Sequence, residues 1–189
     1  TPGLAYDDLD RRTQGLRTSD QYDGWNGAPD KYDWKLLGKR EMYIPYNSYK
    51  LSDKKLKYAD IIKPDNLNPQ LLRYELHRVW VIEATLRPGE HHRYPRRIFY
   101  LDEDTWLALA YEGWDHSDKL FRLLLSNGLP DYAHGGVVVG SSAQVYDFSK
   151  GQYAGVQLML AKGGYARYGQ PFLSDSEMAP ARLGARGIR

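Results

Sequence analysis

The sequence contains no cysteine among its 189 residues. Disulfide bonds, thiolate metal sites and cysteine nucleophiles are therefore excluded. The sequence also lacks an apolar run near the ~18 residues that a membrane-spanning helix requires. Its formal net charge is only +2, with acids and bases interspersed, so no strong field attracts nucleic acid. We accordingly expect no nucleic-acid partner and no transmembrane segment.

Nucleotide-binding and serine-hydrolase motifs are absent as well. Gly135-Gly136 is followed neither by the Lys-Ser or Lys-Thr of a phosphate-binding loop nor by a helix-forming stretch. Gly140-Ser141-Ser142-Ala143 lacks the spacing of a nucleophilic serine elbow. The sequence therefore predicts no nucleotide cofactor and no catalytic serine.

Three polar runs invite a metal interpretation, which their spacing does not favour. His91 and His92 are adjacent, so on a strand they would point to opposite faces, and a polar loop is favoured. Residues 115–118 lack the full spacing of a calcium loop, and a turn is the better interpretation. Residues 102–105 are also interpreted as a turn, because Asp and Thr side chains bind nearby backbone in turns. The sequence predicts no metal site and no other cofactor.

Aromatic residues and β-rich runs are what the sequence does contain. There are 16 tyrosines and 5 tryptophans, which suit half-buried sheet surfaces. Residues 75–125 hold four β-rich runs separated by short turns, the signature of an antiparallel meander. The runs lie at 75–87, 98–101, 106–111 and 120–125. The middle of the first run, 79–82, is apolar on both faces, whereas a half-solvated sheet alternates. We therefore expect apolar material against both faces, and strong curvature.

The predicted fold class is mainly β (α+β), a strongly curved antiparallel sheet or incomplete β-barrel with few short helices. Residues 1–34 are expected to be a polar irregular lead-in. Residues 35–161 are expected to form the antiparallel meander. Residues 162–189 are predicted to be an extended, basic, Gly/Pro/Ala-rich tail, with one domain overall.

Individual residues predict where strands and helical turns begin and end within the meander. A strand should end at Pro45, and Asn68 should cap a short helical segment that begins at Pro69. Residues 127–131 are predicted to be a loop. Three further strands are expected at 137–139, 144–148 and 153–160, the last two as a hairpin.

Glu75 and His77 are the acid–base candidates. They lie two residues apart and therefore on one face of a strand. A buried carboxyl there would have a raised pKa and could act as a general acid. The alternative, which the residues favour, is a solvated rim of the sheet where Arg73, Arg78 or Arg97 forms salt bridges as a sheet-flanking charge.

Several stretches resemble the proteobacterial family catalogued as domain of unknown function 1329. The resemblance covers about residues 30–160, and residues 73–106 are specific to it. The stretches that carry it are Asp33-Trp34-Lys35, Tyr43-Ile44-Pro45-Tyr46-Asn47, Leu67-Asn68-Pro69, Arg73-Tyr74-Glu75-Leu76-His77-Arg78-Val79-Trp80-Val81 and Tyr94-Pro95-Arg96-Arg97-Ile98-Phe99-Tyr100-Leu101-Asp102-Glu103-Asp104-Thr105-Trp106.

The resemblance implies a fold and a location. The family is similar to the periplasmic lipoprotein-sorting carriers LolA and LolB, in which an incomplete antiparallel barrel lidded by helices holds acyl chains. Members are typically longer and exported, which implies that this chain is a periplasmic C-terminal portion without its leader. The family has no established catalytic residues, so none is carried over.

The leading functional hypothesis is a non-enzymatic protein that binds a lipid, a lipoprotein acyl chain or another hydrophobic ligand. Arg78 is the candidate contact for an anionic head group. A second hypothesis is a module that pairs through sheet edges with an envelope protein or the rest of a longer chain. A hydrolase-type enzyme using Glu75 and His77 is the third. The candidate cavity residues, which core packing would explain equally well, are Trp80, Ile82, Phe99, Tyr100, Trp106 and Leu123.

Overall fold

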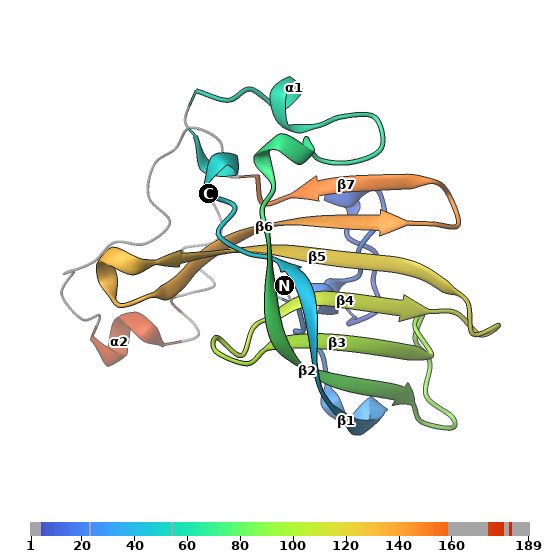
Figure 1. The fold of residues 1–189 in the computed structure, drawn as a ribbon. Helices are drawn as coiled ribbons and strands as arrows, with labels where there is room; N and C mark the ends of the chain where they lie inside the picture. The colour runs from blue at the N-terminus through green and yellow to red at the C-terminus, as the bar shows by residue number, and fades with distance from the viewer. Residues whose placement is uncertain (1–4, 23, 54, 159–173, 180–181, 183–189) are drawn as a thin grey trace.

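A computed structural model shows one seven-stranded antiparallel sheet in which every strand pairs with its sequence neighbours (Figure 1). The structure describes residues 5–22, 24–53, 55–158, 174–179 and 182. The strands are β1 (Tyr32–Pro45), β2 (Tyr74–Leu86), β3 (Arg96–Asp102), β4 (Ala108–Trp114), β5 (Leu120–Asp131), β6 (Val137–Asp147) and β7 (Gln152–Val156). Within the described part of the chain, no helix is long and apolar enough to span a membrane.

Each face of the sheet carries its own apolar cluster, as the doubly apolar strand centres predict. Alternation along β2 sends Ala84 to one cluster, which also holds Phe99 of β3 and its cross-strand partner Tyr111 of β4. It sends Val79 and Val81 to the other. Both valines and Ala84 are buried. The expectation of apolar packing on both faces is therefore confirmed.

The sheet curls strongly but does not close. β1 and the start of β2 cross in front of the middle strands in Figure 1. The end of β1 reaches β5, where Tyr46 forms a parallel bridge to Gly128 and the Asn47 N–H donates to the Gly128 carbonyl at 3.1 Å. We call the face enclosed by this curl the concave face and the opposite one the convex face. The predicted class, a strongly curved open antiparallel sheet with few helices, is confirmed.

The N-terminal segment, residues 5–22 and 24–31, covers the convex face. It contains three 3₁₀ turns, η1 (Arg11–Thr13), η2 (Ser19–Gln21) and η3 (Pro29–Lys31), rather than longer helices. Leu16 and Trp25 from this segment pack into the convex cluster. The lead-in expected for residues 1–34 thus contributes Leu16 and Trp25 to the core, and β1 begins within it at Tyr32.

Residues 49–53 and 55–72 form a second cover, here called the cap segment. It holds η4 (Tyr49–Ser52), α1 (Tyr58–Ile61) and η5 (Pro69–Leu71). As predicted, the Asn68 side chain caps η5 by accepting from the Gln70 N–H at 3.1 Å, and Pro69 occupies the first position. Leu67 is buried in a third cluster that includes Tyr153 of β7. The cap segment therefore lies at the β7 end of the sheet.

Three local predictions are wrong. Residues 127–131 are not a loop but the end of β5, because Pro130 lies beside a register shift, where a missing ladder donor is tolerated. Gly140, Ser141 and Ser142 do not end a strand, since β6 continues through them. Trp106 does not start β4: it lies in the preceding turn with φ 59°.

Only part of the region for which C-terminal structure was predicted lies within the described residues. The hairpin of β6 and β7 is present, although residues 159–160, expected to extend β7, lie outside the described residues. Most of the predicted tail, 162–189, also lies outside them. One helical turn, α2 (Asp175–Met178), occurs in this stretch, where no regular structure was expected.

Candidate ligand-binding face

A strip of half-buried side chains crosses the concave face, and we call it the apolar strip: Ile98, Leu123, Leu125 and Tyr146. The cross-strand register places Ile98 of β3, Leu123 of β5 and Tyr146 of β6 in one row, with Glu112 of β4 between the first two. All four strip residues remain partly accessible. Buried Tyr100 and Ala110 lie in the next row, beside Leu125. The concave face is thus packed beneath this strip and partly open at the strip itself.

The guanidinium of Arg40 lies over the concave face, beside the apolar strip. The Arg40 guanidinium lies 4.7 Å from the ring centroid of Tyr100. Among the described residues, no carboxylate lies within ion-pair distance of Arg40. The Tyr100 hydroxyl donates to Glu112 at 2.9 Å, and the Trp114 indole N–H donates to the same carboxylate at 3.1 Å. Burial, reinforced by Glu112, raises the pKa of Tyr100 to about 12, so the phenol stays neutral.

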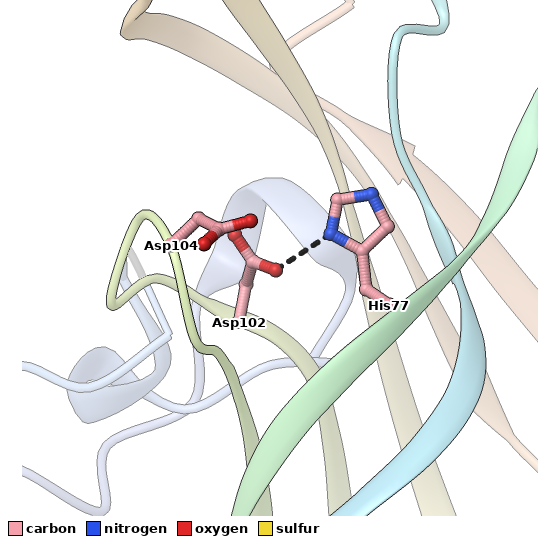
Figure 2. Close-up of side chains that lie close together, drawn as sticks. All are labelled: His77, Asp102 and Asp104. Atoms are coloured by element: carbon pink, nitrogen blue, oxygen red, sulfur yellow. Dashed lines mark hydrogen bonds and ion pairs between the residues drawn. The ribbon is translucent and has the colours of Figure 1, made fainter.

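A polar cluster occupies the closed end of the concave face, where the curl brings β1, β2 and the β3–β4 turn together. His77 Nδ1 lies 2.7 Å from the buried carboxylate of Asp102, as Figure 2 shows. His77 Nε2 lies 3.7 Å from Glu75 Oε2. The Tyr46 ring packs against the imidazole with centroids 4.4 Å apart. The two residues singled out as acid–base candidates therefore do lie together, and Asp102 completes the group.

The protonation state of Glu75 argues against a role as general acid. Burial alone raises the pKa of Glu75, but hydrogen bonds from Asn47 and Arg73, with the charges of Arg73 and His77, outweigh it and lower that pKa. Asn47 Nδ2 donates at 2.8 Å and Arg73 Nε at 2.7 Å, both to Glu75 Oε1. Glu75 is consequently an anion at neutral pH.

Side chains of His77, Asp102 and Asp104 offer possible metal-ligand atoms within 4.8 Å of one another. Figure 2 places Asp104 beside the pair. The side chains of His77 and Asp102 are already engaged, however. Asp102 Oδ1 binds His77, and Asp102 Oδ2 accepts from the Thr105 N–H at 3.0 Å and from the Thr105 hydroxyl at 2.7 Å. Both carboxylate oxygens therefore hold the β3–β4 turn and His77 in place, as the turn interpretation of residues 102–105 predicts.

The structure distributes the predicted cavity residues over different surfaces. Tyr100 and Leu123 face the concave side. Ile82 and Phe99 belong to the convex cluster under the N-terminal segment. Trp80, also on the convex side of β2, stacks on the largely exposed Trp106 with ring centroids 6.2 Å apart. The six residues do not converge on one cavity wall.

Arg78, the predicted anion contact, already has a partner. Its Nε and Nη2 donate to Glu103 at 2.6 and 2.8 Å. These hydrogen bonds, with those from Lys39, lower the pKa of Glu103 to about 2. Arg40 is the cation that sequence reasoning missed. A bulge between Leu36 and Gly38 reverses the alternation of β1, so that Arg40 pairs with Val79 on the concave face.

These features define a class: an open, strongly curved antiparallel sheet with a covered convex face and a partly accessible concave face. The family model "Protein of unknown function (DUF1329)" matches residues 1–183, so the chain belongs to the DUF1329 family. Uncharacterized protein PA3922 of Pseudomonas aeruginosa is 44% identical over 191 residues. That match covers 100% of this chain but 41% of the relative, so the chain spans less than half of that relative's length.

Comparison with solved structures finds two that are similar to this chain at low sequence identity. A DUF1329 family protein from Desulfovibrio piger is 16% identical, with a TM-score of 0.48; the match covers 97% of this chain and 58% of that one. The other comes from Vibrio parahaemolyticus and is described as a candidate outer membrane lipoprotein-sorting protein domain. It is 10% identical, with a TM-score of 0.46; the match covers 80% of this chain and 52% of the Vibrio chain.

Proposed function

We propose that this chain is a non-enzymatic periplasmic protein whose concave face binds an anionic amphiphile, such as a fatty acid or the acyl chain of a lipid or lipoprotein. One observation carries the proposal: an apolar strip lies partly accessible beside an arginine with no carboxylate partner among the described residues. The periplasmic location and the lipid class are also motivated by the family resemblance of residues 73–106.

The apolar strip supplies the affinity in this proposal. Its side chains are half-buried, so a bound alkyl chain would remove their remaining apolar surface from water. Completing the burial of one such leucine is worth about 1 kcal/mol, since full burial is worth about 1.5–3 kcal/mol. The ring of Tyr146, the fourth member of the strip, is held in place because its hydroxyl hydrogen-bonds Gln144 at 2.6 Å and also Asn66.

Arg40 supplies the head-group contact. A guanidinium binds carboxylates and phosphates through two parallel hydrogen bonds, and the Tyr100 ring beneath it already orients its plane. The nearby carboxylate of Glu112 is engaged by Tyr100 and Trp114. Arg40 therefore remains available to an incoming anion.

Fluorescent fatty-acid titration of the delipidated protein tests this function. Leu123→Asp places a charge in the strip and should abolish saturable binding. Arg40→Ala should weaken binding about tenfold, whereas Arg40→Lys retains the charge and should weaken it less. Arg78→Ala is the matched control, because Arg78 is paired with Glu103 and should leave affinity unchanged.

Flat titrations with the wild-type protein would overturn the proposal. If Arg78→Ala or Trp80→Ala lost binding while Arg40→Ala kept it, the binding site would instead lie on the convex side near Trp106. Circular dichroism should first establish that all variants have the same folded fraction.

Acid–base catalysis is a second candidate, favoured by the 2.7 Å contact between His77 and buried Asp102. A carboxylate that accepts from Nδ1–H fixes the imidazole tautomer and leaves Nε2 free to take a proton. Hydrolysis of a graded series of p-nitrophenyl esters tests it. Turnover lost in both His77→Ala and Asp102→Asn would support an enzyme, and wild-type rates equal to buffer would remove this candidate.

A further inference from the structure

The outer edge of β7 lines a groove of about 790 Å³. β7 is a terminal strand of the sheet, and among the described residues only β6 pairs with it. The lining includes consecutive residues of the strand, from Gln152 to Gly155. Unpaired backbone N–H and C=O groups of an edge strand are available to another extended chain. The groove therefore exposes main-chain hydrogen-bonding groups.

Two segments of the chain flank this strand edge, one on each side, and form the walls of the groove. One comes from the N-terminal segment and includes Leu16, which packs in the convex cluster with Ala154. The other comes from the cap segment and includes Ile62. The Tyr153 hydroxyl fixes this second wall by donating to the Asn66 carbonyl at 2.7 Å, and it also contacts the Lys63 carbonyl. Side chains of β7 itself thus hold both walls, and the slot is preformed.

The lining is positively charged. It contains Arg12 and Lys63, and it includes no aspartate or glutamate. Asp10 lies 3.2 Å from Arg12 and balances part of its charge. The Lys63 ammonium donates to the Ala59 carbonyl at 2.8 Å and, within the described chain, has no carboxylate partner. An occupant with carboxylate side chains matches this charge.

We propose that this groove binds an extended, acidic peptide segment of a partner protein by strand addition to β7. Five residues of β7 at the usual rise of ~3.3 Å give an edge of roughly 17 Å, enough for about five residues of partner strand. The partner's main chain pairs with the strand edge. Its alternate side chains meet the Leu16 wall and the Ile62 wall, and its carboxylates meet Arg12 and Lys63.

A designed nine-residue peptide, in which pairs of valines alternate with pairs of glutamates so that both faces of the extended chain carry both residue types, is the probe. Titrated into ¹⁵N-labelled protein, it should shift the amide resonances of residues 152–156 and slow their hydrogen exchange. Two matched peptides control the chemistry: one N-methylated on alternate backbone amides, and one with lysine in place of each glutamate. Both should bind at least about fivefold more weakly.

Variants of the protein test the charge assignment. Arg12→Glu with Lys63→Glu should reduce affinity for the acidic peptide about fivefold to tenfold and restore binding of the lysine peptide. Arg93→Glu with Lys119→Glu makes the same charge change at exposed positions away from the groove and should have no effect. Equal binding of the N-methylated peptide, or shifts elsewhere than β7, would overturn strand addition. The fatty-acid titration is independent of either result.

Discussion

Buried charged side chains attach the N-terminal segment to the sheet. Arg97 of β3 is fully buried, and its Nη2 lies 2.7 Å from the Asp20 carboxylate of that segment. The guanidinium also lies 4.8–4.9 Å from the ring centroids of Trp25, Tyr32 and Tyr94. Sequence reasoning treated Arg97 as a flanking charge, because nothing local reveals that a distant aspartate and three rings surround it.

Asp20→Ala tests the strength of this attachment. Removing one partner leaves the buried guanidinium of Arg97 uncompensated, so the free energy of unfolding should fall by about 3–5 kcal/mol. Asp33→Ala breaks an exposed ion pair with Arg87 and should cost less than about 1 kcal/mol. Urea denaturation measures both. Equal costs for the two variants would contradict a buried ionic attachment.

His92 makes the same attachment pH-dependent. Burial lowers the pKa of His92 below 6.5, although the Asp20 hydrogen bond partly opposes this. The unfolded chain therefore binds a proton at a higher pH than the folded protein, and the free energy of unfolding should decrease as pH falls below about 6.5.

Urea denaturation between pH 7.5 and pH 5 checks this dependence. The window lies above the lowered pKa of Asp20, whose contribution to stability is lost only at more acidic pH. His92→Gln should flatten the profile. A stability that is constant or rises on acidification in the wild-type protein would contradict the sign.

At the scale of strands, the sequence predicts best where hydrophobic pattern and turn residues agree. β2 was expected at 75–87 and lies at Tyr74–Leu86. β5 and β6 are longer than expected because glycine, proline and serine, which usually end strands, occur here beside a register shift that the sheet accommodates. The bulge in β1 was not predicted, although Gly38 with φ 113° marks it, and it decides that Arg40 rather than Lys39 lies over the concave face.

A close strand approach at Gly113 of β4 gives a prediction at this scale. A Cβ there would lie 2.8 Å from Tyr94 Cδ1 and 3.1 Å from Arg122 Cβ. Gly113→Ala should therefore lower the free energy of unfolding by about 1–3 kcal/mol through overpacking. Gly128→Ala is the control, because its Cβ would make an ordinary 3.4 Å contact with Leu109. A Gly113→Ala variant as stable as that control would contradict the packing.

For the molecule as a whole, residue patterns and family resemblance together predicted the open curved sheet. Which residues share a surface depends on the curl, on the bulge in β1 and on the segments that cover each face, and of these only the bulge has a local signature, Gly38. The two proposed sites use different parts of this architecture: the concave face for an amphiphile, and the β7 edge for a peptide. Because the chain spans 41% of its Pseudomonas relative, both are proposals for this portion alone.

The most direct test of the proposed function is to locate a bound fatty acid on the protein. A stearic acid that carries a nitroxide near the middle of its chain, added to ¹⁵N,¹³C-labelled protein, broadens nearby NMR resonances. We expect broadening of the Ile98, Leu123 and Leu125 side chains, reversed by reducing the nitroxide and absent in Leu123→Asp. Broadening centred on Trp80 and Trp106, or none at all, would contradict binding at the concave face.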